Sequence, residues 1–140
     1  MTRIHSYLSF NGNCREAMRF YRSCLGGNLA LQTVGDSPHP ASLPAPMKKA
    51  VVQGTLTRDN WVLMGSDLMA EGLVRGNNMA LMLCCSSEKQ ARSYYKKLSS
   101  GGRATYPLHN TYWGALFGNL TDRYGNHWLL HYDKATAKKK

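Results

Sequence analysis

The sequence contains an internal repeat that limits the folds open to it. The helical stretch Ala17–Arg22 aligns with Ala91–Lys96, and both stretches lead to a Gly-Gly pair. Further on, Asn60–Asp67 aligns with Asn126–Asp133, with Asn, Leu and Asp at the same positions. A repeated unit of this kind cannot cover its apolar sheet face alone, so the two copies are expected to pair. We therefore predict an α+β fold in which tandem βαβββ modules form curved mixed sheets around a cleft.

Hydrophobic periodicity and turn residues define the elements of each module. For the first module, they predict one helix between Asn13 and Gly26 and strands at Ile4–Phe10, Asn28–Val34, Lys49–Thr57 and Asn60–Ser66. For the second module, they predict one helix between Ser87 and Gly101 and strands at Asn78–Cys84, Arg103–Tyr106, Gly114–Thr121 and His127–Tyr132.

The ends of these elements carry their own signals. Asn13 with Glu16, and Ser87 with Gln90, have the spacing of a capping box at the start of a helix. The stretch Gly35–Met47 contains four of the five prolines, so it is predicted to be a surface loop rather than a helix or a central strand.

We expect one domain over residues 1–133, with modules at about 1–67 and 78–133 and a linker at 68–77. Residues 134–140 contain four lysines and are predicted to form a basic, disordered tail. Without those lysines the net charge of +10 falls to about +6, which we expect to be spread along the chain with no basic stripe. Specific nucleic-acid binding is therefore not the leading expectation.

The sequence also indicates the cellular compartment of the protein. No apolar run reaches the roughly 18 to 20 residues that a membrane span needs, and no secretory signal is visible. The four cysteines, Cys14, Cys24, Cys84 and Cys85, form no Cys-x-x-Cys motif. We therefore expect reduced, mostly buried thiols and a cytoplasmic protein.

Several stretches of the sequence resemble one known family. They are Tyr7–Tyr21, Leu63–Asp67, Thr111–Gly114, and Gly118–Gly125 followed by His127 and Trp128. Together with the repeat, they resemble the PhnB-like branch of the vicinal-oxygen-chelate superfamily, which includes glyoxalase I, bleomycin-resistance proteins and extradiol dioxygenases. The resemblance covers roughly residues 3 to 133. It implies a homodimer with cup-shaped clefts that bind a small molecule.

The enzymes of that superfamily hold a divalent metal in the cleft, so the resemblance also implies candidate metal ligands. The four ligand positions fall on His5, approximately on Gln53, near Asn78 and on Leu129. Leucine cannot coordinate a metal, and asparagine is a weak ligand. His131, two residues after Leu129, could replace the lost ligand. The candidate metal set is therefore His5, Gln53 and His131, for Zn, Ni, Mn or Fe.

Strand alternation gives an independent view of the cleft. His5, Tyr7 and Ser9 share one face of the first strand, whereas Ile4, Leu8 and Phe10 are expected to pack on the helix. On the last strand, Trp128, Leu130 and Tyr132 suit the helix side, which leaves His127, Leu129 and His131 on the cleft side.

The candidate ligand-binding residues are Tyr7, Gln53, Met82 and Trp113. The resemblance places Trp113 near the cleft mouth, where an aromatic wall suits a flat or apolar ligand. Ordinary alternatives remain for most of the candidate site residues. They are a hydrogen-bonded strand histidine at His5, a surface or rim histidine at His131, an ordinary polar strand residue at Gln53, a hydrophobic lid at Trp113 and a core-filling role for Met82.

Three functions stay open at this stage. The first is a protein that binds a small molecule in a dimeric cleft, with an unknown reaction and unknown catalytic residues. The second is a divalent-metal-dependent lyase, isomerase or dioxygenase of the same superfamily, and the third is a basic nucleic-acid-binding or interaction module. A methyltransferase is not expected, because no glycine-rich methyl-donor loop follows the first strand.

Overall fold

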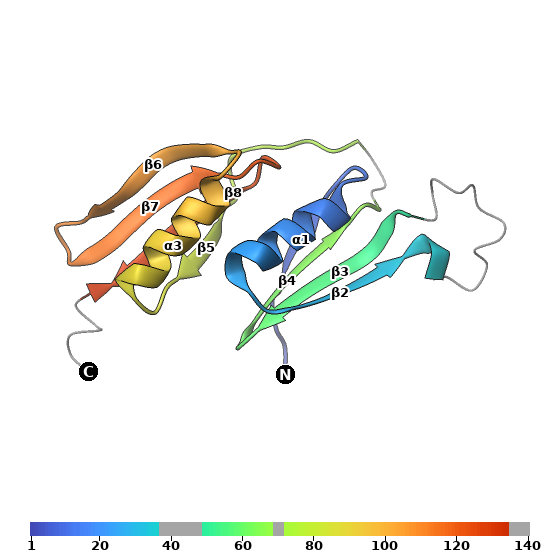
Figure 1. The fold of residues 1–140 in the computed structure, drawn as a ribbon, viewed down its shortest axis with the longest axis horizontal. Coiled ribbons are helices and arrows are strands. Elements are labelled where there is room, and N and C mark those ends of the chain that lie inside the picture. Colours follow the sequence, from blue (N-terminus) through green and yellow to red (C-terminus); the bar gives the residue numbers. More distant parts are fainter. Residues whose placement is uncertain (37–48, 69–71, 135–140) are drawn as a thin grey trace. The chain divides into compact units, whose positions relative to one another are not determined.

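The computed structural model describes residues 1–36, 49–68 and 72–134. The chain divides into two compact units, Met1–Val74 and Arg75–Lys140, and each is described by itself. Each unit contains a strand, a helix and three further strands that form one four-stranded mixed sheet (Figure 1). The prediction of an α+β fold built from two βαβββ modules is confirmed.

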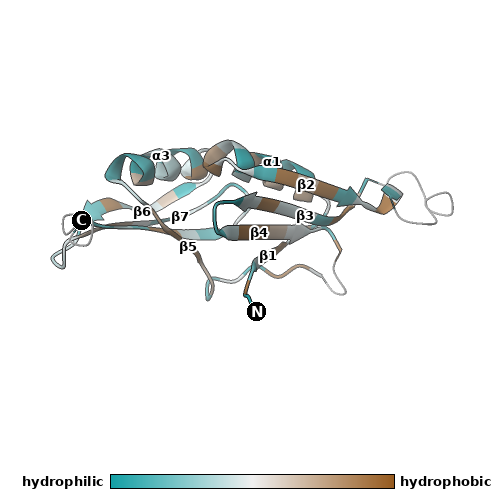
Figure 2. Ribbon diagram, turned by 90° about the horizontal axis from the view of Figure 1, so that it is seen from below, coloured by the Kyte–Doolittle hydropathy of each residue, from teal (hydrophilic) through white to brown (hydrophobic). Residues whose placement is uncertain are grey.

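The first unit has the sheet order β1-β4-β3-β2. Its elements are β1 (Ser6–Ser9), α1 (Cys14–Leu25), β2 (Asn28–Thr33), a 3₁₀ turn at Val34–Asp36, β3 (Val51–Arg58) and β4 (Trp61–Ser66). β1 runs parallel to β4, whereas β3 is antiparallel to both of its neighbours. α1 covers one face of this sheet (Figure 2).

The second unit repeats this plan in the order β5-β8-β7-β6. Its elements are β5 (Leu81–Cys84), α3 (Glu88–Ser99), β6 (Arg103–Asn110), β7 (Ala115–Thr121) and β8 (His127–Asp133). β5 runs parallel to β8, and α3 covers one face of the sheet. Within the described residues, no helix is long and apolar enough to cross a membrane.

The core of each unit lies between the helix and the sheet. In the first unit, α1 buries an apolar stripe at helical spacing, formed by Cys14, Ala17, Met18, Tyr21, Cys24 and Leu25. In the second unit, Ala91 and Leu98 of α3 are buried, as are Leu116, Leu120, Trp128 and Leu130 of the sheet. The expected helix-side position of Trp128 and Leu130 is confirmed.

Most strand boundaries differ from the sequence prediction by one or two residues, and the differences at β1, β5 and β6 are the most informative. β1 begins at Ser6 rather than Ile4, and the Ile4 side chain is 97% exposed instead of packed on the helix. β5 begins at Leu81 rather than Asn78. β6 continues through Pro107 to Asn110, although we expected it to end at Tyr106. β6 is an edge strand, and an edge strand tolerates a proline, which has no N–H to donate to the ladder.

The two helices begin differently. Asn13 makes no side-chain cap, so the capping pair predicted for α1 is wrong. Instead Asp67, just after β4, accepts hydrogen bonds at Oδ1 from the backbone N–H groups of Gly12 (2.9 Å) and Cys14 (3.0 Å). Its Oδ2 accepts from the N–H of Val51 at 2.9 Å. A carboxylate satisfies these donors better than a neutral amide and also suits the positive end of the helix dipole.

The capping pair of α3 is confirmed. Ser87 Oγ accepts a hydrogen bond from the backbone N–H of Gln90 at 3.0 Å. The Gln90 side chain returns to the N–H of Ser86 at 2.9 Å, one residue earlier than a strict capping box requires.

The predicted loop and tail fall mostly outside the described residues. Of the proline-rich stretch Gly35–Met47, only Gly35 and Asp36 are described, and both belong to the 3₁₀ turn. Of the tail, only Lys134 is described, and it is part of the second unit rather than solvated chain. Its ammonium lies 3.1 Å from the Glu88 carboxylate, because the end of β8 runs beside the start of α3.

Replacing Asp67 with asparagine should lower the free energy of unfolding by about 1 to 3 kcal/mol. An amide has only one acceptor oxygen, so it cannot accept from the backbone N–H groups of Gly12, Cys14 and Val51 as the carboxylate does. Urea denaturation followed by circular dichroism measures this change. Asp59→Asn is the matched control: it makes the same charge change at an exposed turn residue whose pair with Arg58 is 3.8 Å long. Equal stability of Asp67→Asn and Asp59→Asn would contradict the role given to Asp67.

Candidate functional site

The first sheet has one face that α1 does not cover, and two of the predicted ligand-binding residues lie on it. Tyr7 of β1 is 54% exposed and lies opposite Met64 of β4, which in turn lies opposite Thr55 of β3. Gln53 Nε2 donates a weak hydrogen bond of 3.5 Å to Thr55 Oγ1, so Gln53 shares this face. We call these four side chains the first face.

The second sheet has an equivalent uncovered face. Met82 and Cys84 of β5 are exposed and alternate with half-buried leucines. Met82 lies opposite Leu129 of β8, Cys84 lies opposite His131, and His131 lies opposite Phe117 of β7. Because Trp128 and Leu130 of β8 are buried on the α3 side, Leu129 and His131 point to the other side. We call these five side chains the second face.

The first unit does not bring His5 and Gln53 together as a ligand pair. Ser6, next to His5, is level with Leu63 of β4, and Leu63 is level with Leu56 of β3. Gln53 is three residues further along β3, a distance of about 10 Å, and β3 lies two strands away from β1. The two residues thus lie at different levels of the sheet, and their role as a ligand pair stays a prediction.

The other described side chains that could bind a metal are also dispersed. Among the described residues, no group of three or more His, Cys, Asp and Glu side chains is placed to hold a metal ion. The family-type ligand set of His5, Gln53 and His131 stays a prediction, and no catalytic step is derived through a metal here.

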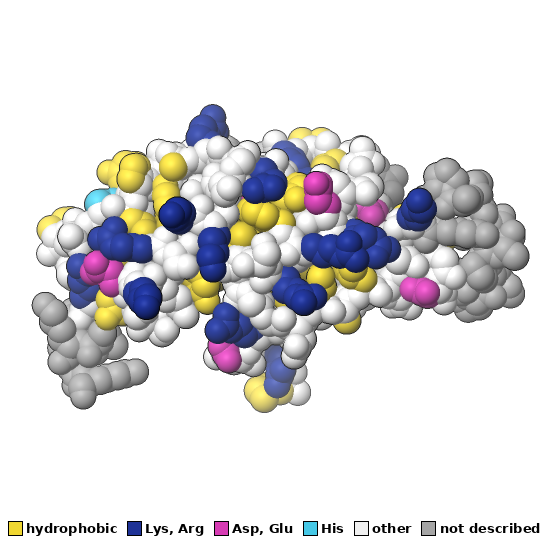
Figure 3. All heavy atoms as spheres, viewed as in Figure 1, with side chains coloured by type: hydrophobic (Ala, Val, Ile, Leu, Met, Phe, Trp, Pro, Cys, Tyr) yellow, Lys and Arg dark blue, Asp and Glu magenta, His cyan; other side chains and the backbone are white. Residues whose placement is uncertain are grey.

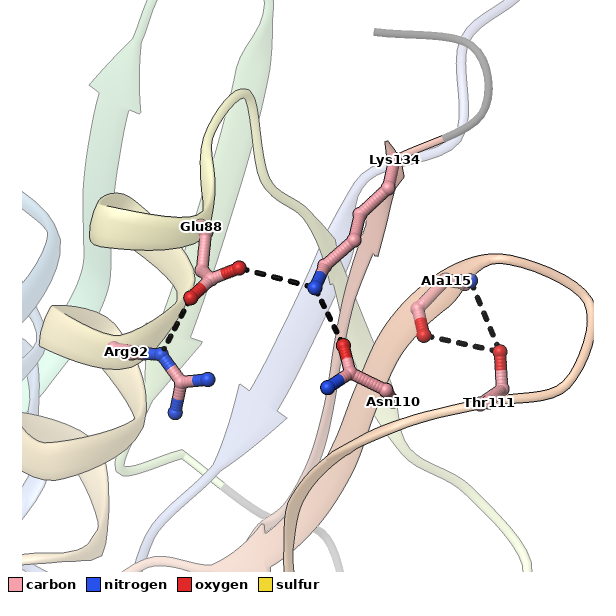
Figure 4. Close-up of polar contacts among 6 residues, drawn as sticks. All are labelled: Glu88, Arg92, Asn110, Thr111, Ala115 and Lys134. Atoms are coloured by element: carbon pink, nitrogen blue, oxygen red, sulfur yellow. Dashed lines mark hydrogen bonds and ion pairs between the residues drawn. The ribbon is translucent and has the colours of Figure 1, made fainter. Parts of the chain in front are cut away.

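Trp113 lies on the loop Thr111–Gly114 between β6 and β7, not on a sheet face. Thr111 Oγ1 accepts from the N–H of Ala115 and donates to its carbonyl, both at 3.0 Å (Figure 4). Gly114 adopts a φ of 88°, which closes the turn. The loop presents Tyr112 (98% exposed) and Trp113 (56% exposed), whose rings meet edge to face at 4.9 Å.

An ionic cluster fixes the base of this aromatic loop. Glu88 at the start of α3 accepts from Arg92 Nε at 3.1 Å and pairs with Lys134 Nζ at 3.1 Å. Lys134 also donates to the Asn110 side chain, directly before Thr111 (Figure 4). The hydrogen bonds from Lys134 and Arg92 hold the pKa of the Glu88 carboxyl below its usual value.

His127 has a structural role that the sequence did not reveal. Its Nδ1 lies 2.9 Å from Thr121 Oγ1, and its Nε2 lies 3.0 Å from the carbonyl of Gly76. Both ring nitrogens are therefore engaged within the second unit, and the residue joins the start of β8 to the chain that leads into β5. The His127 side chain is half-buried.

The cysteines differ in accessibility. All four are thiols rather than disulfides; Cys14 and Cys24 are buried, Cys85 is half-buried and Cys84 is exposed. Burial, helped by the charge of Asp67, raises the pKa of Cys14 to about 12. Burial and the neighbouring Cys84 raise the pKa of Cys85 to about 11. Cys84 is thus the accessible thiol, which agrees with mostly buried cysteines.

The positive charge is more ordered than we expected. α1 carries Arg15, Arg19 and Arg22, and α3 carries Lys89, Arg92, Lys96 and Lys97. Helical spacing of three and four residues places each set along the outward side of its helix. Figure 3 shows several Lys and Arg side chains over the faces that carry the helices, with hydrophobic, acidic and other atoms between them. The expectation of no basic stripe is therefore wrong. In each unit the stripe lies on the side opposite the uncovered sheet face.

A comparison with known families decides the identity of the fold. The model of the Glyoxalase/Bleomycin resistance protein/Dioxygenase superfamily matches residues 3–130. The chain belongs to this superfamily. Members of the superfamily often use divalent metals and are usually dimers with small-molecule ligands.

Individual relatives agree with this membership over nearly the whole chain. Protein YjdN of Escherichia coli (strain K12) is 26% identical over 137 residues, covering 91% of this chain and 93% of that protein. The crystal structure of protein PA1353 from Pseudomonas aeruginosa has 36% identity and a TM-score of 0.83, covering 95% of this chain and 98% of that one.

A third relative is described as a PhnB protein. A Bacillus cereus protein described as a putative 3-demethylubiquinone-9 3-methyltransferase, PhnB protein, has 24% identity and a TM-score of 0.73. The alignment covers 94% of this chain and 99% of that protein, and it shows a shared fold. The superfamily and the fold predicted from the sequence motifs are thus confirmed.

Sequence reasoning missed several residues of the two faces. Met64 and Thr55 were not singled out, although they connect Tyr7 with Gln53 across three strands. Cys84 was treated only as a thiol, although alternation on Met82–Cys84 places both side chains on one face. Alternation along the sequence could have placed Cys84 on this face. The position of Tyr7 opposite Met64 could not be predicted in this way, because it depends on how β1 pairs with β4.

Alkylation should follow the accessibility of the thiols. At about pH 8, iodoacetamide should label Cys84 first, Cys85 more slowly and Cys14 last, because a thiol of strongly raised pKa holds little of the reactive thiolate. Peptide mass spectrometry over a time course measures the order. In urea all four sites should label at similar rates, which provides the internal control. Early labelling of Cys14 in the folded protein would contradict this assignment.

Proposed function

We propose that the chain is a cytoplasmic, homodimeric glyoxalase/bleomycin-resistance-type protein that binds a small molecule against its uncovered sheet faces. The observation that carries this proposal is the exposure of Tyr7 and Met82, both on the first strand of a unit and on the side without a helix. Solvent-exposed apolar side chains grouped with a few polar ones are typical of ligand sites.

The first face has the composition that such a site requires. Tyr7 and Met64 supply an aromatic ring and a flexible thioether side by side, and Gln53 with Thr55 supplies hydrogen-bonding groups next to them. The aromatic ring suits a flat ligand, and methionine adapts to irregular shapes. Met82 and Trp113 are the contacts proposed from the second unit.

Dimerisation and location rest on other support. Superfamily members are usually dimers, which supports the proposed homodimer. The four reduced thiols suit a reducing compartment, which supports the cytoplasm. Both remain parts of the proposal, and light scattering of the purified protein measures the number of subunits.

The alternative of a divalent-metal-dependent lyase, isomerase or dioxygenase has weaker support. Its ligands would be His5, Gln53 and His131, and the register of the first sheet separates His5 from Gln53. The basic stripes on α1 and α3 support attraction to polyanions by charge alone, which is independent of sequence. Binding of a small molecule is the function that the uncovered faces support best.

A fluorescence titration with the dye 1-anilinonaphthalene-8-sulfonate tests the proposed site. Tyr7→Ala should weaken dye binding at least about tenfold, or about 1.4 kcal/mol, because the dye loses an aromatic contact. Bleomycin should displace the dye if it uses the same face. Tyr112→Ala is the control, since it removes a tyrosine that is 98% exposed, more than Tyr7 at 54%, from the loop between β6 and β7.

Two results would count against this proposal. One is equal dye binding by wild type, Tyr7→Ala and Met82→Ala. The other is an equal loss in Tyr112→Ala. Salt-dependent affinity for duplex DNA, together with dye binding that Tyr7→Ala leaves unchanged, would instead favour the nucleic-acid-binding alternative.

Metal analysis tests the enzyme alternative separately. Untagged protein purified without chelator should contain the same trace amounts of zinc, nickel, manganese and iron before and after His5→Ala, because His5 and Gln53 do not converge. Inductively coupled plasma mass spectrometry gives the metal content per chain, with His109→Ala as control. One metal per chain that only His5→Ala removes would reinstate the metal-dependent enzyme.

A further inference from the structure

Two side chains with soft sulfur donors and one imidazole lie close together on the second face. Met82 and Cys84 lie two residues apart on β5, so their side chains leave the strand on the same side about 7 Å apart. His131 is the partner of Cys84 on the neighbouring parallel strand β8, where strands are about 4.8 Å apart. A thioether, a thiol and an imidazole thus lie on the same side of two hydrogen-bonded strands.

The three groups are accessible from one side. Met82 is 52% exposed and Cys84 is exposed, whereas His131 is half-buried. Leu129 is the cross-strand neighbour of Met82, and Phe117 is the cross-strand neighbour of His131. The donor atoms therefore lie in apolar surroundings at the surface of the sheet.

This donor set selects one class of cation. Hard cations such as Mg²⁺ and Ca²⁺ prefer oxygen ligands, whereas thiolate and thioether sulfur favour Cu(I). One thiolate with two neutral donors also balances the charge of a monovalent ion. A divalent ion would keep a net positive charge next to Leu129 and Phe117, which is unfavourable in apolar surroundings.

We propose that Met82, Cys84 and His131 form a binding site for a soft monovalent cation of the Cu(I) and Ag(I) class, with two sulfur ligands and one nitrogen ligand. Binding replaces the proton of the Cys84 thiol, which is released to solvent. The site uses residues of the second unit only. It goes beyond the proposed small-molecule function and does not depend on it.

The adjacent cysteine provides a control within the same strand end. Cys85 follows Cys84 just beyond the end of β5, is half-buried, and its thiol lies 3.8 Å from the carbonyl oxygen of Leu83. Cys85→Ala should therefore leave the site intact, although it removes a thiol next to Cys84.

The first unit provides the control for methionine. Met64 is a methionine on the uncovered face of the first sheet, and its cross-strand neighbours are Tyr7 and Thr55 rather than a cysteine. Met64→Leu and Met82→Leu make the same change of shape and polarity. Only Met82→Leu should affect the cation.

The experiment is an anaerobic titration of the reduced full chain with Cu(I), in competition with the coloured chelator bicinchoninate. Wild type should bind one Cu(I) per chain. Cys84→Ser should lose at least about a hundredfold in affinity, and Met82→Leu and His131→Gln about tenfold each, since even indirect changes around metal ligands cost 10- to 100-fold. Cys85→Ala and Met64→Leu should bind as wild type, and Ag(I) should repeat the pattern without redox chemistry.

The results distinguish a three-ligand site from binding by one thiol or by two adjacent thiols. If Met82→Leu and His131→Gln both keep the wild-type affinity, Cu(I) binds a single exposed thiol and the three-ligand site is overturned. A loss in Cys85→Ala equal to that in Cys84→Ser would also overturn it, because adjacent thiols would then suffice. Urea unfolding of each variant shows whether the variant is still folded. Met82→Leu keeps a side chain of similar volume, so a loss of Cu(I) affinity in this variant reports the missing sulfur.

Discussion

The parallel pairing of the first and last strands of each unit is the constraint on which the rest of the structure depends. β1 pairs with β4 and β5 pairs with β8, so the next strand along the chain, β2 or β6, lies at the opposite edge of the sheet. The helix between the two strands must therefore cross one face of the sheet. The helix covers that face with its apolar stripe and leaves the opposite face uncovered. The same pairing sets Tyr7 beside Met64 and Cys84 beside His131, so both candidate faces originate from it.

Features that depend on nearby residues were predictable from the sequence. The apolar stripe of α1, the Gly-Gly ends of the helices and the cap by Ser87 all involve residues within four or five positions of one another. The cap of α1 was not predictable in this way. Asn13 has the right type and position, but Asp67, more than fifty residues away, satisfies the same donors, and only the fold brings it there.

The candidate site shows the same division. Alternation along a single strand correctly placed Tyr7 and Met82 on the side without a helix. It could not show that Tyr7 lies opposite Met64, or that Met64 lies opposite Thr55, because these relations follow from the register between strands. The same register sets Gln53 three residues along β3 from the level of Ser6. The continuation of β6 through Pro107 to Asn110 was not predicted for a related reason: only the sheet order shows that β6 lies at an edge.

The two sides of each sheet differ in how much chemical variation they permit. On the helix side of the first unit, a methyl group added at Gly65 would lie 3.0 Å from Phe10 and 3.1 Å from Met18, and one at Gly54 would lie 3.2 Å from Met18. This side is packed so tightly that extra atoms would displace its neighbours. The uncovered side leaves Tyr7 and Met82 half in solvent, so its side chains can change with little cost to the core. The repeated fold can therefore carry a hydrogen-bonding aromatic face in one unit and a sulfur- and imidazole-bearing face in the other.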